Sequence, residues 1–297
     1  MATGGGARQL DPIDVLKVLE ARSTRPPRSP SDGSVPPLVT PLVILVLGTA
    51  FFRLSRADVA ISQWFYGGGS GYGWPLLGAE PWRSIYRYGV VPAWALAVGG
   101  LAVALLSFGV WRLKRWRRAG LFLFLLLLLG PGLLVNALFK PHWMRPRPSQ
   151  TAAFGGVEQF EPVWDVGQST QSRSFPSGHA SMGFYLMAPA FLVYRRRRRL
   201  AVAFFAAGLA GGMVMGLTRI VQGGHFASDV LWSAGCVYLT GLLLYVLLRF
   251  HEDRPAATTP ADGPLVPYLI EPAATPEPVI PAEPAEEPET PDYRRAA

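Results

Sequence analysis

Six apolar segments divide the chain, and none of them contains a lysine, arginine, aspartate or glutamate. They cover residues 36–52, 88–111, 119–139, 179–194, 200–218 and 230–248. A helix that crosses a bilayer needs about 17–25 mostly apolar residues, so most of these segments are long enough to span one. The pattern predicts an all-α fold, an integral membrane helical bundle with six transmembrane helices.

The polar segments between and around these six define the expected domain organisation. Residues 58–66 predict a short interfacial helix with Ile61, Trp64 and Phe65 toward lipid, ended by a glycine-rich run. Residues 1–35 are polar and form an N-terminal segment, and residues 36–250 form the membrane domain. Residues 251–297 contain eleven prolines and no apolar periodicity, which predicts a disordered tail.

The charges are distributed unevenly. Residues 1–251 carry a balance of +15 and residues 252–297 a balance of −7. Two short arginine-rich links, 112–118 and 195–199, fall on the same side of a six-helix arrangement as both termini, and the positive-inside rule assigns that side to the cytoplasm. The polar stretches 140–178 and 219–229 then face outward. The basic excess belongs to the membrane part of the chain, where it suits lipid head groups and topology, so we expect no nucleic-acid partner.

The outward stretch before the last apolar segment places three reactive residue types at fixed offsets. Arg219 precedes His225 by six residues, and Asp229 follows after four more. Arginine can bind phosphate with a planar fork of donors, histidine can attack phosphorus or carry a proton, and aspartate can hold that histidine in one tautomer. If the stretch is helical, His225 and Asp229 share a face. Such a pair alone is also common as a structural contact.

Two further outward stretches offer anion-binding groups. Lys140 and Arg147, seven residues apart, supply a point charge and a bidentate fork. Ser177, Gly178 and His179 open the fourth apolar segment, where Ser177 suits a helix N-cap and free N–H groups bind anions. His179 could protonate a leaving oxygen there. The alternatives are cations that snorkel to the membrane interface and an ordinary helix cap.

A metal site is the rival interpretation of the same side chains. His142, His179, His225 and Asp229 are potential ligands. The lysine and arginines expected nearby would oppose a cation and favour an anion. We therefore expect neither a metal nor another cofactor.

In this order, the spacings Lys-x6-Arg-Pro, Pro-Ser-Gly-His and Arg-x5-His-x3-Asp resemble the type 2 phosphatidic acid phosphatase superfamily, which also contains bacterial acid phosphatases and vanadium haloperoxidases. The resemblance covers about residues 36–250, and one departure is Thr218, where serine is common. The run Arg-Pro-Arg-Pro-Ser-Gln at 145–150 with Phe-Gly-Gly at 154–156, and Gly-Gly-His-Phe at 223–226, is similar to the bacterial lipid A phosphatase branch.

The resemblance implies roles for the matching residues. His225 would be the nucleophile that forms a phosphohistidine, Asp229 would orient it, and His179 would be the general acid. The phosphoryl oxygens would be bound by five residues: Lys140, Arg147, Ser177, Gly178 and Arg219. His142, Arg145 and Arg173 flank these motifs as further candidates.

The implied activity is hydrolysis of a phosphate monoester or diphosphate of a lipid, with a lipid A-like substrate. The enzyme would lie in a bacterial inner membrane with its site toward the periplasm and no obligate protein partner. The long outward connection before residue 176 suits substrate recognition. Undecaprenyl diphosphate, phosphatidylglycerol phosphate and phosphatidic acid are alternative substrates. Phosphotransfer to an alcohol, haloperoxidase chemistry and non-enzymatic lipid binding or transport are alternative functions.

Overall fold

The computed structural model of the chain describes residues 35–67, 73–168 and 171–252, and within these ranges it is helical, with no β-strand. The all-α prediction is confirmed. The helices are α2 Val39–Leu54, α3 Ala57–Gln63, α4 Trp82–Tyr88, α5 Val91–Leu106, η2 Trp111–Trp116, α6 Arg117–Leu127, η3 Leu128–Phe139, α7 Lys140–Trp143, η4 Pro148–Gln150, η5 Ala152–Phe154, α8 Gly178–Tyr185, α9 Ala188–Val193, α10 Arg198–Val221, α11 Ala227–Leu247 and η6 Phe250–Glu252. The predicted polar segment 1–35, except its last residue, and nearly all of the predicted tail lie outside the described ranges.

Four helical stretches in the described part of the chain are long and apolar enough to cross a membrane: Trp82–Leu106, Trp111–Gln150, Arg198–Val221 and Ala227–Leu247. The first predicted span corresponds to α2, which is apolar but has only 16 residues. The fourth corresponds to two short helices, α8 and α9. The structure therefore supports a membrane bundle but does not confirm the count of six spans.

Proline explains where two of the apolar segments lose regular α-helical geometry. Pro189 lies in the first turn of α9, where its missing N–H is tolerated. The preceding helix, α8, ends at Tyr185, because a proline inside a continuous helix would break it. Pro131 lies inside η3, a π-helix that continues α6. Asn136 adds a side-chain hydrogen bond to this irregular turn by donating from Nδ2 to the Pro131 carbonyl at 2.6 Å.

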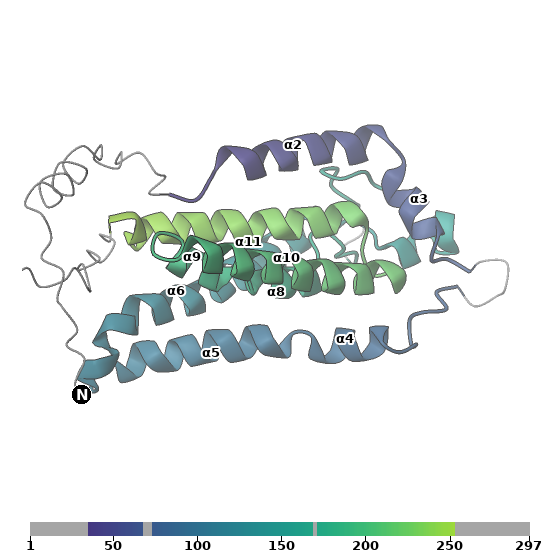
Figure 1. Cartoon of the computed structure of the whole chain (residues 1–297). Helices are drawn as coiled ribbons and strands as arrows, with labels where there is room; N and C mark the ends of the chain where they lie inside the picture. The colour runs from purple at the N-terminus through teal and green to yellow at the C-terminus, as the bar shows by residue number, and fades with distance from the viewer. Residues whose placement is uncertain (1–34, 68–72, 169–170, 253–297) are drawn as a thin grey trace, which may run out of the picture. The chain divides into compact units, whose positions relative to one another are not determined.

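The helix α11 occupies the centre of the bundle and packs against α2, α6, η3, α8, α9 and α10. Figure 1 shows α2, α5, α6, α10 and α11 running side by side along one direction. A buried apolar cluster fills the space between them and includes Phe122, Leu126, Tyr185, Phe191 and Tyr245. The outer faces of α2 and α5 expose large apolar side chains, as lipid-facing helices do.

Close packing of α8 on α10 depends on small residues. A Cβ atom built on Gly183 would lie 2.5 Å from the carbonyl oxygen of Gly211, so the two backbones nearly touch. Small residues allow such approaches between membrane helices. The contact holds the start of α8 beside the end of α10, where two of the three polar stretches lie.

The predicted interfacial helix exists as α3, but its orientation was partly wrong. Trp64 is 80% exposed, as expected, whereas Ile61 and Phe65 pack against the protein core. The reason is Asp58, which is completely buried on the same helix and forms hydrogen bonds to α11. That polar anchor turns the adjoining apolar residues inward.

Candidate active site

The three polar stretches singled out in the sequence meet at one end of the bundle. The backbone N–H of Ser177, at the start of α8, donates to the carbonyl of Asp229 on α11 at 3.2 Å. The N–H of Ser149, beyond α7, donates to the carbonyl of Gly223 at 3.0 Å. The loop between α10 and α11 is thus hydrogen-bonded to both other stretches.

His225 and Asp229 are buried at this junction and face each other. The Nδ1 atom of His225 lies 3.5 Å from Oδ2 of Asp229, and the two residues are 3% and 0% exposed. The stretch is not continuously helical, because His225 precedes α11 and Asp229 lies in its first turn. The carboxylate reaches back over the helix start and accepts the backbone N–H of Phe226 at 2.8 Å. The contact was expected, but the helical reason for it was wrong.

The electrostatics favour a neutral imidazole at His225. Burial lowers its pKa to about 4, although the hydrogen bond and charge of Asp229 oppose that shift. The ring is therefore uncharged from roughly pH 5 upward. Because Nδ1 faces the carboxylate, the Nε2 lone pair is available to an electrophile.

Asp229 receives more donors than the sequence indicated. Oδ2 accepts the hydroxyl hydrogen of Ser174 at 2.5 Å, and Oδ1 accepts a hydrogen from Nη1 of Arg145 at 2.5 Å. Ser174 also lies 3.5 Å from Nδ1 of His225. No signal in the spacing distinguished Ser174 from the other serines of its stretch.

Lys140 reaches the N-terminus of α8. A Cβ atom on Gly178 would lie 2.8 Å from Nζ of Lys140 and 2.7 Å from Oδ1 of Asn136, so only glycine leaves room for both side chains. Ser177 is the N-cap of α8, as predicted, and accepts the Ala180 N–H at 3.3 Å. Asn136 was missed, although it is the only side chain with a hydrogen-bonding group in the apolar segment 119–139.

Arg219 lies beside the same junction with an unused donor. Its Nη1 donates to Oε1 of Gln222 at 2.6 Å, while within the described ranges its Nε is buried without a hydrogen-bond partner. A Cβ atom on Gly224 would lie 2.1 Å from its Nη2, so the guanidinium covers that glycine. A buried, unsatisfied cationic donor is costly unless an anion binds there.

His179 lies near these cations and stacks on an aromatic ring. Its imidazole lies 4.4 Å from the ring centre of Tyr86 on α4, with 22° between the planes. The guanidinium carbon of Arg219 lies 4.6 Å from the same ring centre. Tyr86 therefore sets the position of both side chains. Sequence reasoning missed it because Tyr86 resembles any aromatic residue at a membrane interface.

The positive charges gather around this junction. Arg147, Arg219 and the exposed Arg173 are all close enough for their charges to act on Lys140. Such a cluster, over a helix N-terminus, suits a phosphate dianion. In the described part of the chain, no three histidine, cysteine, aspartate or glutamate residues group as metal ligands.

The further candidates have different positions. Arg173 belongs to the cationic cluster around Lys140. His142 is exposed, and its Nδ1 contacts the Leu138 carbonyl of the preceding turn at 2.6 Å. Arg145, the third flanking candidate, is fully buried and donates to Asp229, so it contacts that carboxylate and not a bound substrate.

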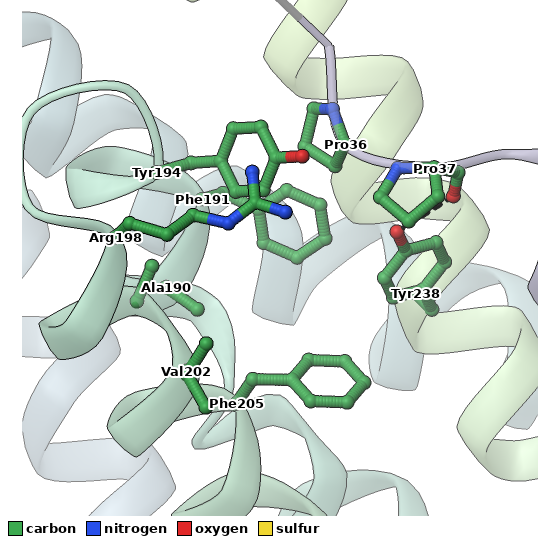
Figure 2. A pocket seen from close by; sticks show the side chains of 10 residues that line it. Pro36, Pro37, Ala190, Phe191, Tyr194, Arg198, Val202, Phe205 and Tyr238 are labelled. Atoms are coloured by element: carbon green, nitrogen blue, oxygen red, sulfur yellow. Dashed lines mark hydrogen bonds between the residues drawn. The ribbon is translucent and has the colours of Figure 1, made fainter. Parts of the chain in front are cut away.

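A separate apolar pocket lies at the opposite ends of the same helices (Figure 2). Its volume is about 190 Å³, and Pro36, Pro37, Phe191, Tyr194, Arg198, Phe205 and Tyr238 are among its lining residues. Arg198 begins α10 and Arg219 lies near its end, so the pocket and the cationic cluster are about 30 Å apart along that helix. The pocket contributes nothing to the junction described above.

Comparisons with known proteins agree with these motifs. Residues 119–255 match the model of the PAP2 superfamily. A lipid A 4'-phosphatase from Francisella tularensis subsp. novicida is 44% identical over 140 residues, which are 47% of this chain and 62% of the relative. A lipid A 4'-phosphatase from Rhizobium leguminosarum is 35% identical over 131 residues, 43% of this chain and 55% of the relative.

These matches confirm the resemblance to the PAP2 superfamily and to its lipid A phosphatase branch. A third match, 34% identical over 131 residues, is the lipid A 4'-phosphatase of Rhizobium etli. The chain spans about half to three fifths of the length of the curated relatives it matches. No solved structure matches the chain.

Proposed function

We propose that this chain, whose residues 119–255 match the PAP2 superfamily, is a membrane lipid phosphatase that removes phosphate from a lipid A-like substrate. The observation that carries the proposal is the buried His225–Asp229 pair beside the cationic cluster, in which Arg219 has an unused buried donor. Phosphoryl transfer requires positioning and charge neutralisation, and this arrangement supplies both from side chains.

The reaction would proceed in two steps through His225. In the first, Nε2 attacks phosphorus, the N–P bond forms, and the P–O bond to the lipid breaks while His179 donates a proton to the departing oxygen. In the second, water attacks the phosphohistidine, His179 takes the proton of that water, and phosphate leaves. Asp229 stabilises the positive charge on the ring during both steps.

The cations would bind the equatorial oxygens of the transferred group. Lys140, Arg147 and Arg219 would supply the positive charge, and the free N–H groups at the start of α8 would complete the site. These contacts strengthen as charge develops on the oxygens in the transition state.

We also infer the orientation of the chain in the membrane. Arg118 donates to the carbonyl of Leu248 and Arg195 contacts the carbonyl of His251, so both arginine-rich links lie at the C-terminal end of α11. The His225–Asp229 pair lies at its N-terminal end. This separation supports the six-span arrangement in a bacterial inner membrane, with cytoplasmic links and termini and a periplasmic site. The membrane domain would cover residues 36–250. The polar segment 1–35 would precede it in the chain, and the segment 251–297 would follow it.

The position of Arg219 can be tested through Gly224. We expect Gly224→Ala to lower kcat/KM by about 10²-fold, because the added methyl group must displace the guanidinium by more than an ångström. The assay is phosphate release by purified protein in detergent. Gly99→Ala on α5 is the matched control, since nothing lies within 4 Å of its added Cβ. Equal kcat/KM values for both variants would show that Arg219 does not bind the phosphoryl group.

The substrate is tested by mass spectrometry of lipid A from bacteria that express the chain. We expect lipid A to lose one phosphate, and to retain it in cells that express His225→Ala. The purified protein should release phosphate faster from lipid A than from undecaprenyl diphosphate, phosphatidylglycerol phosphate or phosphatidic acid. An unchanged phosphate count with rapid hydrolysis of undecaprenyl diphosphate would reassign the substrate to that carrier lipid.

A further inference from the structure

A ring of buried polar groups lies beneath the His225–Asp229 pair and connects it to the N-terminal part of the chain. Arg145 donates from Nη1 to Oδ1 of Asp229 at 2.5 Å and from Nη2 to Oδ2 of Asp58 at 2.9 Å. Ser228 closes the ring, since its hydroxyl accepts from Nη1 of Arg145 at 2.8 Å and donates to Oδ2 of Asp58 at 2.5 Å. Its backbone N–H donates to Oδ1 of Asp58 at 2.9 Å.

The guanidinium in this ring is held on every side. Nε of Arg145 donates to the carbonyl of Glu161 at 2.9 Å. The central guanidinium carbon of Arg145 lies 4.6 Å from the ring centre of Phe226. Its side chain is 0% exposed, and that of Asp58 is 1% exposed. A side chain fixed in this way can orient a neighbour with little freedom of its own.

The two oxygens of Asp229 have separate partners. Oδ1 accepts from Arg145, while Oδ2 accepts from Ser174 and Phe226 and faces His225. The bond from Arg145 therefore prevents rotation of the carboxylate and keeps Oδ2 toward the imidazole. Asp58 in turn keeps Arg145 in place from the other side of the guanidinium.

The charges of the ring have a second effect on His225. With both carboxylates ionised, Asp58, Arg145 and Asp229 carry a net charge of −1. Without Asp58, Arg145 would neutralise Asp229, and less negative charge would face the imidazole as it becomes positive. Burial raises the pKa of Asp58, and the charge of Arg145 opposes that shift.

We propose that Asp58 and Arg145 are positioning residues that fix the orientation and charge of Asp229 and so set the rate of phosphoryl transfer at His225. The inference rests on the proposed phosphatase function. A role in stability alone is the alternative, but a buried ion pair gives little net stability once desolvation is included. Such a role would also not require one oxygen of Asp229 to be reserved for Arg145.

The test uses Asp58→Asn in the full-length protein, with hydrolysis of lipid A and of para-nitrophenyl phosphate measured in detergent. We expect kcat to fall about tenfold, by analogy with outer partners of metal ligands. KM should stay within about twofold, because Asp58 contacts none of the phosphate ligands. Glu252→Gln is the control: it also removes one negative charge, from an exposed pair with Arg249 at 3.2 Å. It should leave kcat and KM unchanged.

A double-mutant cycle separates positioning from stability. If Asp58 acts through Asp229, adding Asp58→Asn to Asp229→Asn should cause no further loss of kcat. An undiminished tenfold loss in that background, or an unchanged kcat in the single variant, would overturn the inference. If Asp58→Asn does not fold, Ser228→Ala must show the same fall in kcat at constant KM, and a wild-type kcat would count against the proposal.

The two proposals fail in different ways. Wild-type protein that releases phosphate from neither substrate removes the phosphatase function and this inference with it. Active wild-type protein with an equally active Asp58→Asn variant removes the inference alone.

Discussion

Replacing His225 with alanine is expected to reduce phosphate release by about 10⁵-fold or more, the range found when a catalytic nucleophile is removed. In the proposed mechanism this side chain supplies the attacking nitrogen, and each neighbour lacks either nucleophilicity or access. Ser174 is buried and donates its hydrogen to Asp229, and the nearby lysine and arginines are cations. The measurement is phosphate release from lipid A by purified protein. A second assay traps the phosphoenzyme, which the His225→Ala variant should not form at all.

The matched control for this variant is His142→Ala. His142 is an exposed imidazole at the same end of the bundle that contacts only its own helix in the described structure, so its loss should leave turnover unchanged. Both variants should elute as the wild-type protein does in detergent and unfold at similar temperatures. Phosphate release near the wild-type rate by folded His225→Ala protein would exclude His225 as the nucleophile.

Replacing Asp229 with asparagine should lower kcat by roughly 10³- to 10⁴-fold, comparable to the loss of the orienting aspartate in a serine protease triad. Every close partner of its two oxygens is a donor: Arg145, Ser174 and the backbone N–H of Phe226. The amide NH₂ of asparagine must therefore point at another donor, which misplaces the group that holds His225. KM should change little, because the phosphate ligands are elsewhere.

This variant should also be less stable than the wild type. Arg145 would retain only Asp58 as a charged partner in a site with no access to water, and weakening a buried ion pair on one side costs up to about 3–5 kcal/mol. Thermal unfolding in detergent measures that loss, and kcat at a temperature well below the transition measures catalysis separately. A stable Asp229→Asn protein with normal kcat would show that the carboxylate neither orients nor stabilises His225.

The sequence predicted well which polar stretches meet, because their residue types suit one chemistry and their spacing is local. The stretch from Arg219 to Asp229, the cap at Ser177 and the cation at Lys140 all come together at one end of the bundle, as the order of apolar segments indicated. The positions of individual helix breaks were less predictable. Leu186 and Met187 interrupt the fourth segment because of a proline that hydropathy alone does not weigh.

Contacts between distant parts of the chain could not be predicted from local patterns. Asp58 looked like one polar residue on an interfacial helix, although it forms hydrogen bonds to a serine 170 positions later. Arg145 was only a further candidate that flanks the motifs, because it lies two residues before Arg147. Residues two positions apart in an extended run would share a face, so nothing local indicated that Arg145 turns into the core and bonds Asp58 and Asp229. Tyr86 was missed because its partners, His179 and Arg219, lie far away from it in the sequence.

The position of Asp58 changes where the catalytic unit begins. The segment that matches the PAP2 superfamily starts at residue 119 and contains His179, His225, Asp229 and every proposed phosphate ligand. A fragment trimmed to that segment would nevertheless leave Arg145 with one carboxylate and an open face where α3 had been. A protein cut at the boundaries of the PAP2 match would thus contain all the motifs but lack the carboxylate of Asp58 that holds Arg145 against Asp229. If Asp58 positions Asp229 as inferred, a fully active fragment must begin before residue 58, which the match at residues 119–255 does not include.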